Sequence, residues 1–224
     1  MNGIEIILII LATVGLIIGI SLAITKVLNH FFDLKKFEDK ISSRKDNKKL
    51  SEKALIITKM INNKTYLDLL KYEKSQFLDM LMELYYSFFS KINRKELNDT
   101  QKTLFYCMLL EDCVQADSII SILEDGIVYD ELEIISKAYK TVGAKKTSDL
   151  VNKLKELLHD YKNDIDSANI AFLENEKLYK KVMDVDDSIS NYPDGVMSDI
   201  YYKYFYNEEK INELFEDLKT KMTF

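Results

Sequence analysis

Residues 6–24 form an apolar run, IILIILATVGLIIGISLAI, that contains no charged residue, no amide side chain and no proline. As a helix this run would reach about 28 Å, which is close to the hydrocarbon thickness of a bilayer. A helix also satisfies its own backbone hydrogen bonds in lipid. The run from Ile6 through Leu11 and Leu16 to Ile24 therefore predicts a transmembrane helix, within an N-terminal anchor at residues 1–25.

The flanks of this run predict its orientation. Residues 1–5 contain no Lys or Arg, unlike the start of a secretory signal peptide, so we expect the anchor to be retained. Residues 26–49 carry eight basic and four acidic side chains. The positive-inside rule then predicts a single-pass protein of the inner or plasma membrane, with its N-terminus outside and its domain in the cytoplasm.

Residues 26–49 are expected to form a juxtamembrane amphipathic segment followed by a linker. Its lysines and arginine suit anionic lipid headgroups, and the contacts are expected through Lys35, Lys36, Arg44 and Lys45. Within the membrane span, Gly15, Gly19 and Ala23 share one helix face, which favours close helix packing and a homodimer. The alternative is that glycine is simply common in membrane helices.

Residues 50–224 are long enough for one domain with its own core. They contain 23 basic and 32 acidic residues, so this acidic domain carries a net charge of −9. Such a charge disfavours nucleic acid and favours a basic protein partner. The whole chain has one proline and six glycines and is rich in Lys, Glu, Leu and Ile. This composition predicts an all-α, irregular multi-helix globular domain.

Helical periodicity and capping residues set the expected elements. The expected caps are Ser51, Asn98, Asp130 with Glu133, Gly143 and Asn207, and a turn is expected at 192–195. The helices are expected at about 51–61, 65–92, 100–114, 130–142, 147–161, 165–182, 196–206 and 208–222, with 65–92 as the central core helix.

Several stretches between residues 104 and 206 resemble one bacterial helical domain family, of largely unknown function. They are Leu110-Glu111-Asp112, Gly126, residues 133–144 running into 146–150, Met183-Asp184-Val185-Asp186-Asp187, and the aromatic helix at 201–205. The family's Asn-Gly-Gly-Phe stretch is absent, and residues 115–119 read Gln-Ala-Asp-Ser-Ile instead. The best-studied member of the family is a DNA-mimic protein, in which acidic side chains imitate duplex phosphates. The resemblance therefore implies a helical fold and, more distantly, a mimic-like role. A toxin-neutralising role is a further version of an acidic module that binds a basic partner.

Motifs for catalysis or metal binding are missing from the sequence. His30 and His159 lie far from any second ligand, and Cys107 and Cys113 are expected to be reduced, partly buried thiols. The acidic residues 184–187 lack the Gly and Glu of an EF-hand and are interpreted as a solvated turn. No cofactor, metal or catalytic residue is therefore predicted.

Acidic and aromatic clusters supply the candidate partner-binding surface. Its residues are Glu111, Asp112, Glu124, Asp125, Asp184, Asp186, Asp187, Tyr201 and Tyr202. Any single tyrosine of the 201–206 patch is more often a core residue than a partner anchor.

Three functions remain open on this evidence. The leading hypothesis is a membrane-anchored, cytoplasm-facing acidic module that acts by protein–protein contact without catalysis. The first alternative is an enzyme acting on a membrane-proximal substrate, with a site assembled from distant residues. The second alternative is a dimeric membrane scaffold that associates through Gly15 and Gly19.

Overall fold

The computed structural model describes residues 51–116, 118–121, 129–162 and 175–221. The apolar run at 6–24, the packing face Gly15, Gly19 and Ala23, and the basic segment 26–49 lie outside the described residues. Among the residues that are described, no helix is both long enough and apolar enough to cross a bilayer.

Helices alone make up the regular structure of the described residues, which confirms the all-α prediction for this part of the chain. The residues after position 50 form one compact unit, Ser51–Phe224. The longer helices are α2 (Glu52–Asn63), α3 (Lys74–Ser87), α4 (Asp99–Ala116), α6 (Glu131–Val142), α7 (Lys145–Leu157), α9 (Glu176–Ser190), α10 (Met197–Phe205), α11 (Glu208–Phe215) and α12 (Leu218–Lys221). Short 3₁₀ helices are η1 (Tyr66–Lys71), η2 (Phe89–Lys91), η3 (Arg94–Glu96) and η4 (His159–Tyr161).

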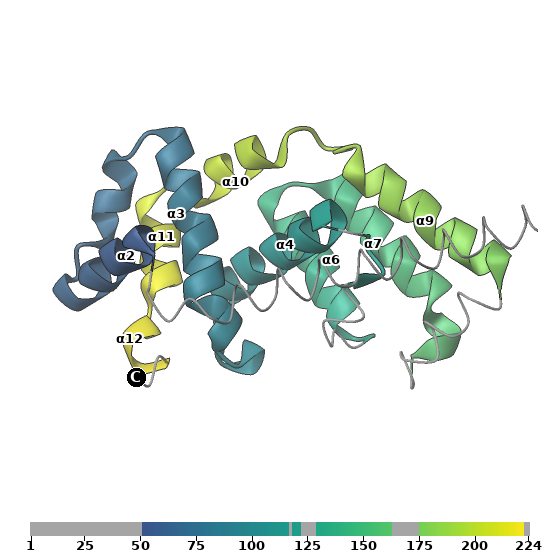
Figure 1. Cartoon of the computed structure of the whole chain (residues 1–224), viewed down its shortest axis with the longest axis horizontal. Helices are drawn as coiled ribbons and strands as arrows, with labels where there is room; N and C mark the ends of the chain where they lie inside the picture. Colours follow the sequence, from purple (N-terminus) through teal and green to yellow (C-terminus); the bar gives the residue numbers. More distant parts are fainter. Residues whose placement is uncertain (1–50, 117, 122–128, 163–174, 222–224) are drawn as a thin grey trace, which may run out of the picture. The chain divides into compact units, whose positions relative to one another are not determined.

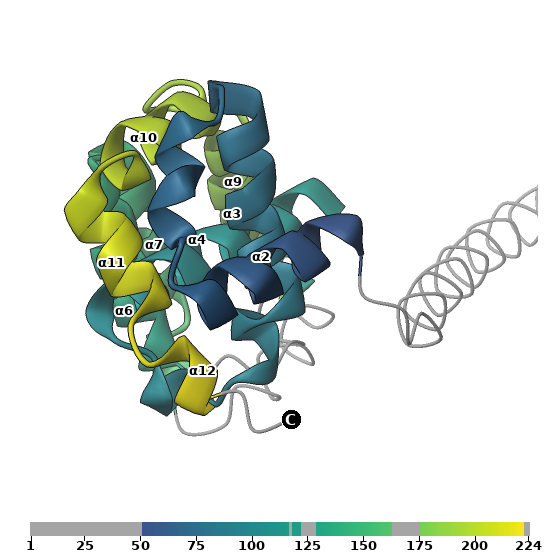
Figure 2. The ribbon, with the colours of Figure 1, turned by 90° about the vertical axis from the view of Figure 1, so that its left-hand side faces the viewer.

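Helix α4 is the central helix of this unit. Its residues 104–110 are all buried, so the helix is covered around its whole circumference. Figure 1 shows α4 between a group formed by α2, α3 and α11 and a group formed by α6, α7 and α9. Figure 2, turned by 90°, shows the first group in front of the second. A helix that is apolar on all sides belongs in the middle of a core.

The prediction of one central helix over residues 65–92 is wrong. The region divides into η1, α3 and η2, with extended backbone at Tyr72 and Glu73 and a break at Phe88. Tertiary contacts explain the division. The Tyr66 ring stacks on Phe215 at 5.0 Å, and the Tyr206 hydroxyl donates to the Leu70 carbonyl, which an uninterrupted helix would pair with its own backbone.

Helices α6 and α7 form a hairpin that is closed by Gly143. Gly143 has φ +97°, the left-handed conformation expected of a glycine after a helix C-terminus, which confirms the prediction. Helix α7 begins at Lys145, slightly before the predicted start. Its cap comes from Asp194, whose carboxylate accepts hydrogen bonds from the backbone N–H groups of Lys146 (3.0 Å) and Thr147 (2.7 Å). A side chain from the turn before α10 therefore fixes the start of α7.

Burial alone would raise the pKa of Asp194. Instead, the pKa is held below its ordinary value by hydrogen bonds from the Lys146 and Thr147 backbone, by the Thr147 hydroxyl and by the Lys146 charge. The carboxylate is therefore stabilised in its charged form where it caps α7.

Residues 184–187 are helical, so the prediction of a solvated acidic turn is wrong. They lie within α9, which continues to Ser190. The Asp186 side chain is buried and accepts a hydrogen bond of 2.6 Å from the backbone N–H of Ile119. Asp184 and Asp187 are exposed on the same helix. The earlier part of the expected 165–182 helix, residues 165–174, lies outside the described residues.

Most predicted caps are confirmed, and one is wrong. Ser51 and Asn207 accept from the first turns of α2 and α11. Asn98 and Gln101 cap α4 reciprocally: the Asn98 side chain accepts from the Gln101 N–H at 2.8 Å, and the Gln101 side chain accepts from the Asn98 N–H at 3.1 Å. Asp130 makes no side-chain cap, because its own backbone is already in the helical region.

Candidate functional site

A groove of about 320 Å³ lies where α3, α4 and the start of α10 meet. Its lining residues come from three segments that are distant in sequence. They are Leu78, Met82 and Tyr86 of α3, Met108, Glu111, Asp112 and Gln115 of α4, and Tyr192, Val196, Met197, Ser198 and Tyr201 of the turn and α10. The α3 residues are spaced by four positions and so form one stripe along the helix.

Exposed apolar side chains cluster around the groove. Of the eight large hydrophobic residues exposed within the described residues, four line it: Met82, Tyr86, Tyr192 and Val196. Scattered exposed apolar residues are normal on a protein surface, but a cluster around a depression is typical of a binding site.

Glu111 is the half-buried acid of this groove. Its Oε1 atom lies 3.3 Å from the Tyr139 hydroxyl and 3.4 Å from the Tyr201 hydroxyl, and its Oε2 atom accepts from the Gln115 side chain at 3.2 Å. The Tyr139 hydroxyl has one proton and lies closer, at 3.1 Å, to the Cys107 carbonyl oxygen. When Tyr139 donates to Cys107, the donors to Glu111 among the described residues are Tyr201 and Gln115, both at long distances.

The environment of Glu111 disfavours its charge. Burial raises its pKa above the ordinary value of 4.5, and hydrogen bonds from Tyr139, Gln115 and Tyr201 only partly offset this; the Asp112 charge raises the pKa further. Within the described residues no lysine, arginine or histidine forms an ion pair with Glu111. The protein therefore keeps an acid in a place where its ionised form costs stability.

This cost predicts the stability of Glu111→Gln. Because the folded-state pKa is raised, the stability contributed by the protonated carboxyl is present below pH 4.5 and is lost as the pH rises through the folded-state pKa. The glutamine has no such loss, and its amide oxygen can still accept from Tyr201. We expect urea unfolding at pH 7 to give the variant a free energy of unfolding at least equal to that of the wild type. The free energy of unfolding of the wild type should fall relative to that of the variant as the pH rises above 4.5. Parallel pH profiles of the two proteins would contradict a raised pKa at Glu111.

Side-chain hydrogen bonds connect the residues at the rim of the groove. The Tyr86 hydroxyl donates to the Asp112 carboxylate, and the Gln115 amide also donates to the Tyr192 hydroxyl at 3.2 Å. Tyr192 has φ +50°, a left-handed conformation that is uncommon for a bulky residue and costs on the order of 1 kcal/mol. The turn that contains it, 192–195, was predicted correctly and contains Gly195 at φ +102°.

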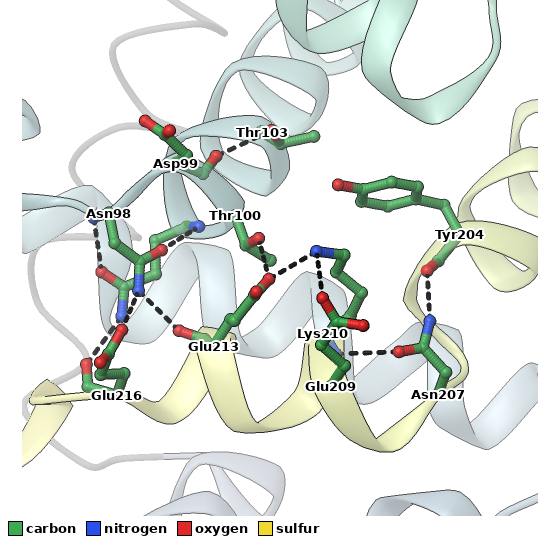
Figure 3. Close-up of polar contacts among 11 residues, drawn as sticks. Asn98, Asp99, Thr100, Thr103, Tyr204, Asn207, Glu209, Lys210, Glu213 and Glu216 are labelled. Atoms are coloured by element: carbon green, nitrogen blue, oxygen red, sulfur yellow. Dashed lines mark hydrogen bonds and ion pairs between the residues drawn. The ribbon is translucent and has the colours of Figure 1, made fainter.

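A second cavity, of about 620 Å³, lies between the start of α4, α6 and α11, and part of it is drawn in Figure 3. It contains the acids Asp99, Glu213 and Glu216. Glu213 pairs with Lys210 at 2.6 Å and accepts from the Thr100 hydroxyl, while Glu216 accepts from the Asn98 amide at 3.2 Å.

The Glu213 and Glu216 carboxylates have separate partners, and the three carboxylates are not directed at a common point (Figure 3). The hydrogen bonds from Lys210 and Thr100 hold the pKa of Glu213 below its ordinary value. The contacts join α4 to α11, so the described residues of this cavity form a polar connection between these helices.

The structure brings together three of the residues proposed for a partner surface: Glu111, Asp112 and Tyr201 all line the groove. Tyr201 is buried, as expected for most of its patch. Tyr202 lies elsewhere, stacked on Tyr206 with ring centroids 4.4 Å apart. Asp184, Asp186 and Asp187 belong to α9, and Glu124 and Asp125 lie outside the described residues.

Sequence reasoning missed the apolar rim of the groove. Met82 lies within the stretch 65–92 that was predicted to be the central core helix, yet 45% of its surface is exposed. The stripe of apolar residues on α3 is wider than one core-facing surface requires. That excess width was the available signal.

The remaining candidates have ordinary environments. Cys107 and Cys113 are both buried, more fully than the partial burial that was predicted. His159 is exposed, and its Nδ1 atom lies 3.3 Å from the Tyr129 hydroxyl; His30 lies outside the described residues. No group of three or more His, Cys, Asp or Glu side chains able to hold a metal ion occurs within the described residues.

Comparison with known proteins bears on this helical unit. No curated protein and no solved structure gives a significant match to the chain. The family model described as DMP19-like protein matches residues 95–219, which is more than half of the chain. This region contains the stretch 104–206 on which the resemblance to a DNA-mimic family was based, and it includes α4, α10 and Glu111 of the groove. The chain therefore belongs to the DMP19-like protein family.

Proposed function

We propose that this protein is a non-catalytic protein-binding module, which docks an apolar segment of a basic partner protein in the groove between α3, α4 and α10. The observation that carries the proposal is the gathering of Met82, Tyr86, Tyr192 and Val196 around one depression. Exposed apolar side chains are unfavourable in water and become favourable when a partner covers them.

Charge supports a basic partner. The described lining of the groove contains two acids, Glu111 and Asp112, and no basic residue. The net charge of −9 over residues 50–224 adds a long-range attraction for a positively charged protein. A mimic-like or toxin-neutralising role is a finer version of the same proposal, since both roles need a basic partner.

The strained position of Tyr192 also fits a binding role. A tyrosine at φ +50° is retained at the rim, where the residue is 40% exposed and its hydroxyl accepts a hydrogen bond from Gln115. Strain of this kind persists at sites where the placed side chain is used. Tyrosine is also favoured at protein interfaces, because it combines a large contact area with a polar tip.

The groove can be tested with two variants that are matched for exposure. Met82 is 45% exposed and lies in the groove, whereas Leu55 is 46% exposed and lies on α2. We expect Met82→Glu to reduce the amount of partner captured by the full-length protein in its host by about tenfold, since a carboxylate would be buried against apolar groups. Leu55→Glu should leave capture unchanged.

Two measurements complete this test. Circular dichroism melting of both variants checks that neither has unfolded, which is expected because both side chains are exposed. Quantitative mass spectrometry then compares captured proteins across wild type and variants. If every captured protein is retained equally by Met82→Glu and by Leu55→Glu, docking in the groove is wrong.

The proposed location is the cytoplasmic face of the membrane, with residues 6–24 as a single-pass anchor and Lys35, Lys36, Arg44 and Lys45 near the headgroups. The hydropathy of the run and the basic residues that follow it support this. We expect full-length protein to stay in the membrane pellet after an alkaline carbonate wash. A variant that lacks residues 1–25 should move to the supernatant. Recovery of the full-length chain in the supernatant would contradict anchoring.

A further inference from the structure

The acid in the groove indicates the chemistry of one partner side chain. Glu111 is half-buried, and its hydrogen bonds are 3.2 Å or longer. A carboxylate has lone pairs for about four hydrogen bonds, and its donors among the described residues are Gln115, Tyr139 and Tyr201. The two tyrosine hydroxyls also have other acceptors, since Tyr139 lies 3.1 Å from the Cys107 carbonyl oxygen and Tyr201 lies 3.5 Å from the Tyr139 hydroxyl. Glu111 therefore keeps the capacity to accept strong hydrogen bonds from a ligand.

Among the residues that the structure describes, the titratable groups around Glu111 are all acids. On α4 they are Cys107 and Asp112; on α3, Tyr86; on α6, Tyr139; and from the turn and α10, Tyr192 and Tyr201. Within the described part of the chain, no lysine, arginine or histidine lines the groove. A half-buried carboxylate is stabilised when a partner supplies a cation, because the partner also excludes water and the pair is then formed in a region of lower dielectric.

The aromatic lining favours arginine over lysine. Tyr86, Tyr192 and Tyr201 line the groove beside Glu111 and Asp112. A guanidinium group is planar, is more weakly hydrated than an ammonium group, stacks on tyrosine rings and can donate two parallel hydrogen bonds to one carboxylate. A lysine ammonium is strongly hydrated and would lose more hydration on entering an apolar groove.

We infer that the groove recognises an arginine side chain of the partner, whose guanidinium group pairs with Glu111 while the neighbouring apolar residues of the partner cover Met82 and Val196. This inference rests on the proposed docking function and names the residue type that the groove selects. Glu111 is then a determinant of specificity. Its ionised carboxyl group lowers the stability of the free protein, and pairing with the partner's arginine stabilises that group in the complex.

The test uses two small probes of nearly the same shape, the cation N-benzylguanidinium and the neutral N-benzylurea. Binding of each probe to the full-length protein in detergent micelles is measured by titration calorimetry. We expect the wild type to bind the guanidinium about tenfold more tightly than the urea, since a charge-assisted pair in a partly buried site is worth about that factor. In Glu111→Gln the two affinities should become equal, through a loss for the guanidinium alone.

Glu156→Gln is the matched control, because Glu156 is an exposed acid on α7 outside the groove. It removes the same charge and should keep the tenfold preference. A preference that survives in Glu111→Gln, or that disappears in Glu156→Gln, would show that net charge alone attracts the cation and would overturn the inference. Failure of both probes to bind the wild type would also overturn it.

The outcomes separate this inference from the docking function. Equal binding of guanidinium and urea to the wild type would remove arginine recognition but leave apolar docking in the groove in place. Conversely, equal capture of partners by the wild type and Met82→Glu would remove the docking function whatever the probes do. Urea unfolding of Glu111→Gln, which is expected to be at least as stable as the wild type, checks that a lost preference for the guanidinium is not a result of unfolding.

Discussion

Replacing Gln101 by methionine is expected to lower the free energy of unfolding by about 3 kcal/mol, because it leaves several buried polar groups without partners. The Gln101 side chain is fully buried. Its amide donates to the carbonyl oxygens of Leu214 (3.0 Å) and Glu216 (2.9 Å), and its oxygen accepts from the Asn98 N–H and the Lys221 ammonium. One side chain therefore caps α4 and donates hydrogen bonds to the carbonyl groups at the end of α11.

Methionine fills a similar volume but can make none of these hydrogen bonds. The expected loss of stability therefore comes mainly from the missing hydrogen bonds. Gln76→Met is the matched control, since Gln76 is exposed on α3. The control should change the free energy of unfolding by less than about 0.5 kcal/mol. Urea unfolding followed by circular dichroism compares the two, and equal stability of the two variants would show that the contacts of Gln101 are not needed.

Replacing Asp186 by alanine is expected to cost about 2 kcal/mol, because the backbone N–H of Ile119 then loses its acceptor in a buried position. Asp186→Asn retains an acceptor oxygen and should cost less than the alanine variant. Asp187→Ala, the next residue on the same helix, is exposed and should be close to neutral. A loss of stability that is as large in Asp187→Ala as in Asp186→Ala would point to an effect on the α9 helix itself, against the proposed contact.

Local signals explain which parts of the fold could be predicted. The caps at Ser51, Asn98, Gly143 and Asn207 depend on residues within four positions of each helix end, so one sequence contains the information. Asp186 shows the limit of such signals. Three acids in four residues resemble a solvated turn, although Val182, Val185 and Ile189 recur with helical spacing and bury one face of α9.

The groove could be predicted only in part, because its residues meet through tertiary packing. Glu111 and Tyr201 were both singled out from sequence, but nothing local indicates that the Tyr201 hydroxyl reaches Glu111 from 90 positions away. The split of residues 65–92 has the same origin: no proline or glycine marks it, and contacts with α11 and with Tyr206 create it. Patterns along the chain gave the type of element, and packing between distant elements decided its length and its exposed face.

The two native thiols have a practical consequence for labelling. Cys107 and Cys113 are the only cysteines of the chain, both are buried, and burial raises the pKa of the Cys107 thiol well above its ordinary value. Maleimides react with accessible thiolates, so both positions should stay unmodified in the native protein. A single cysteine placed at Val196 would then take up a fluorophore or spin label selectively, and its signal would report directly when something covers that rim.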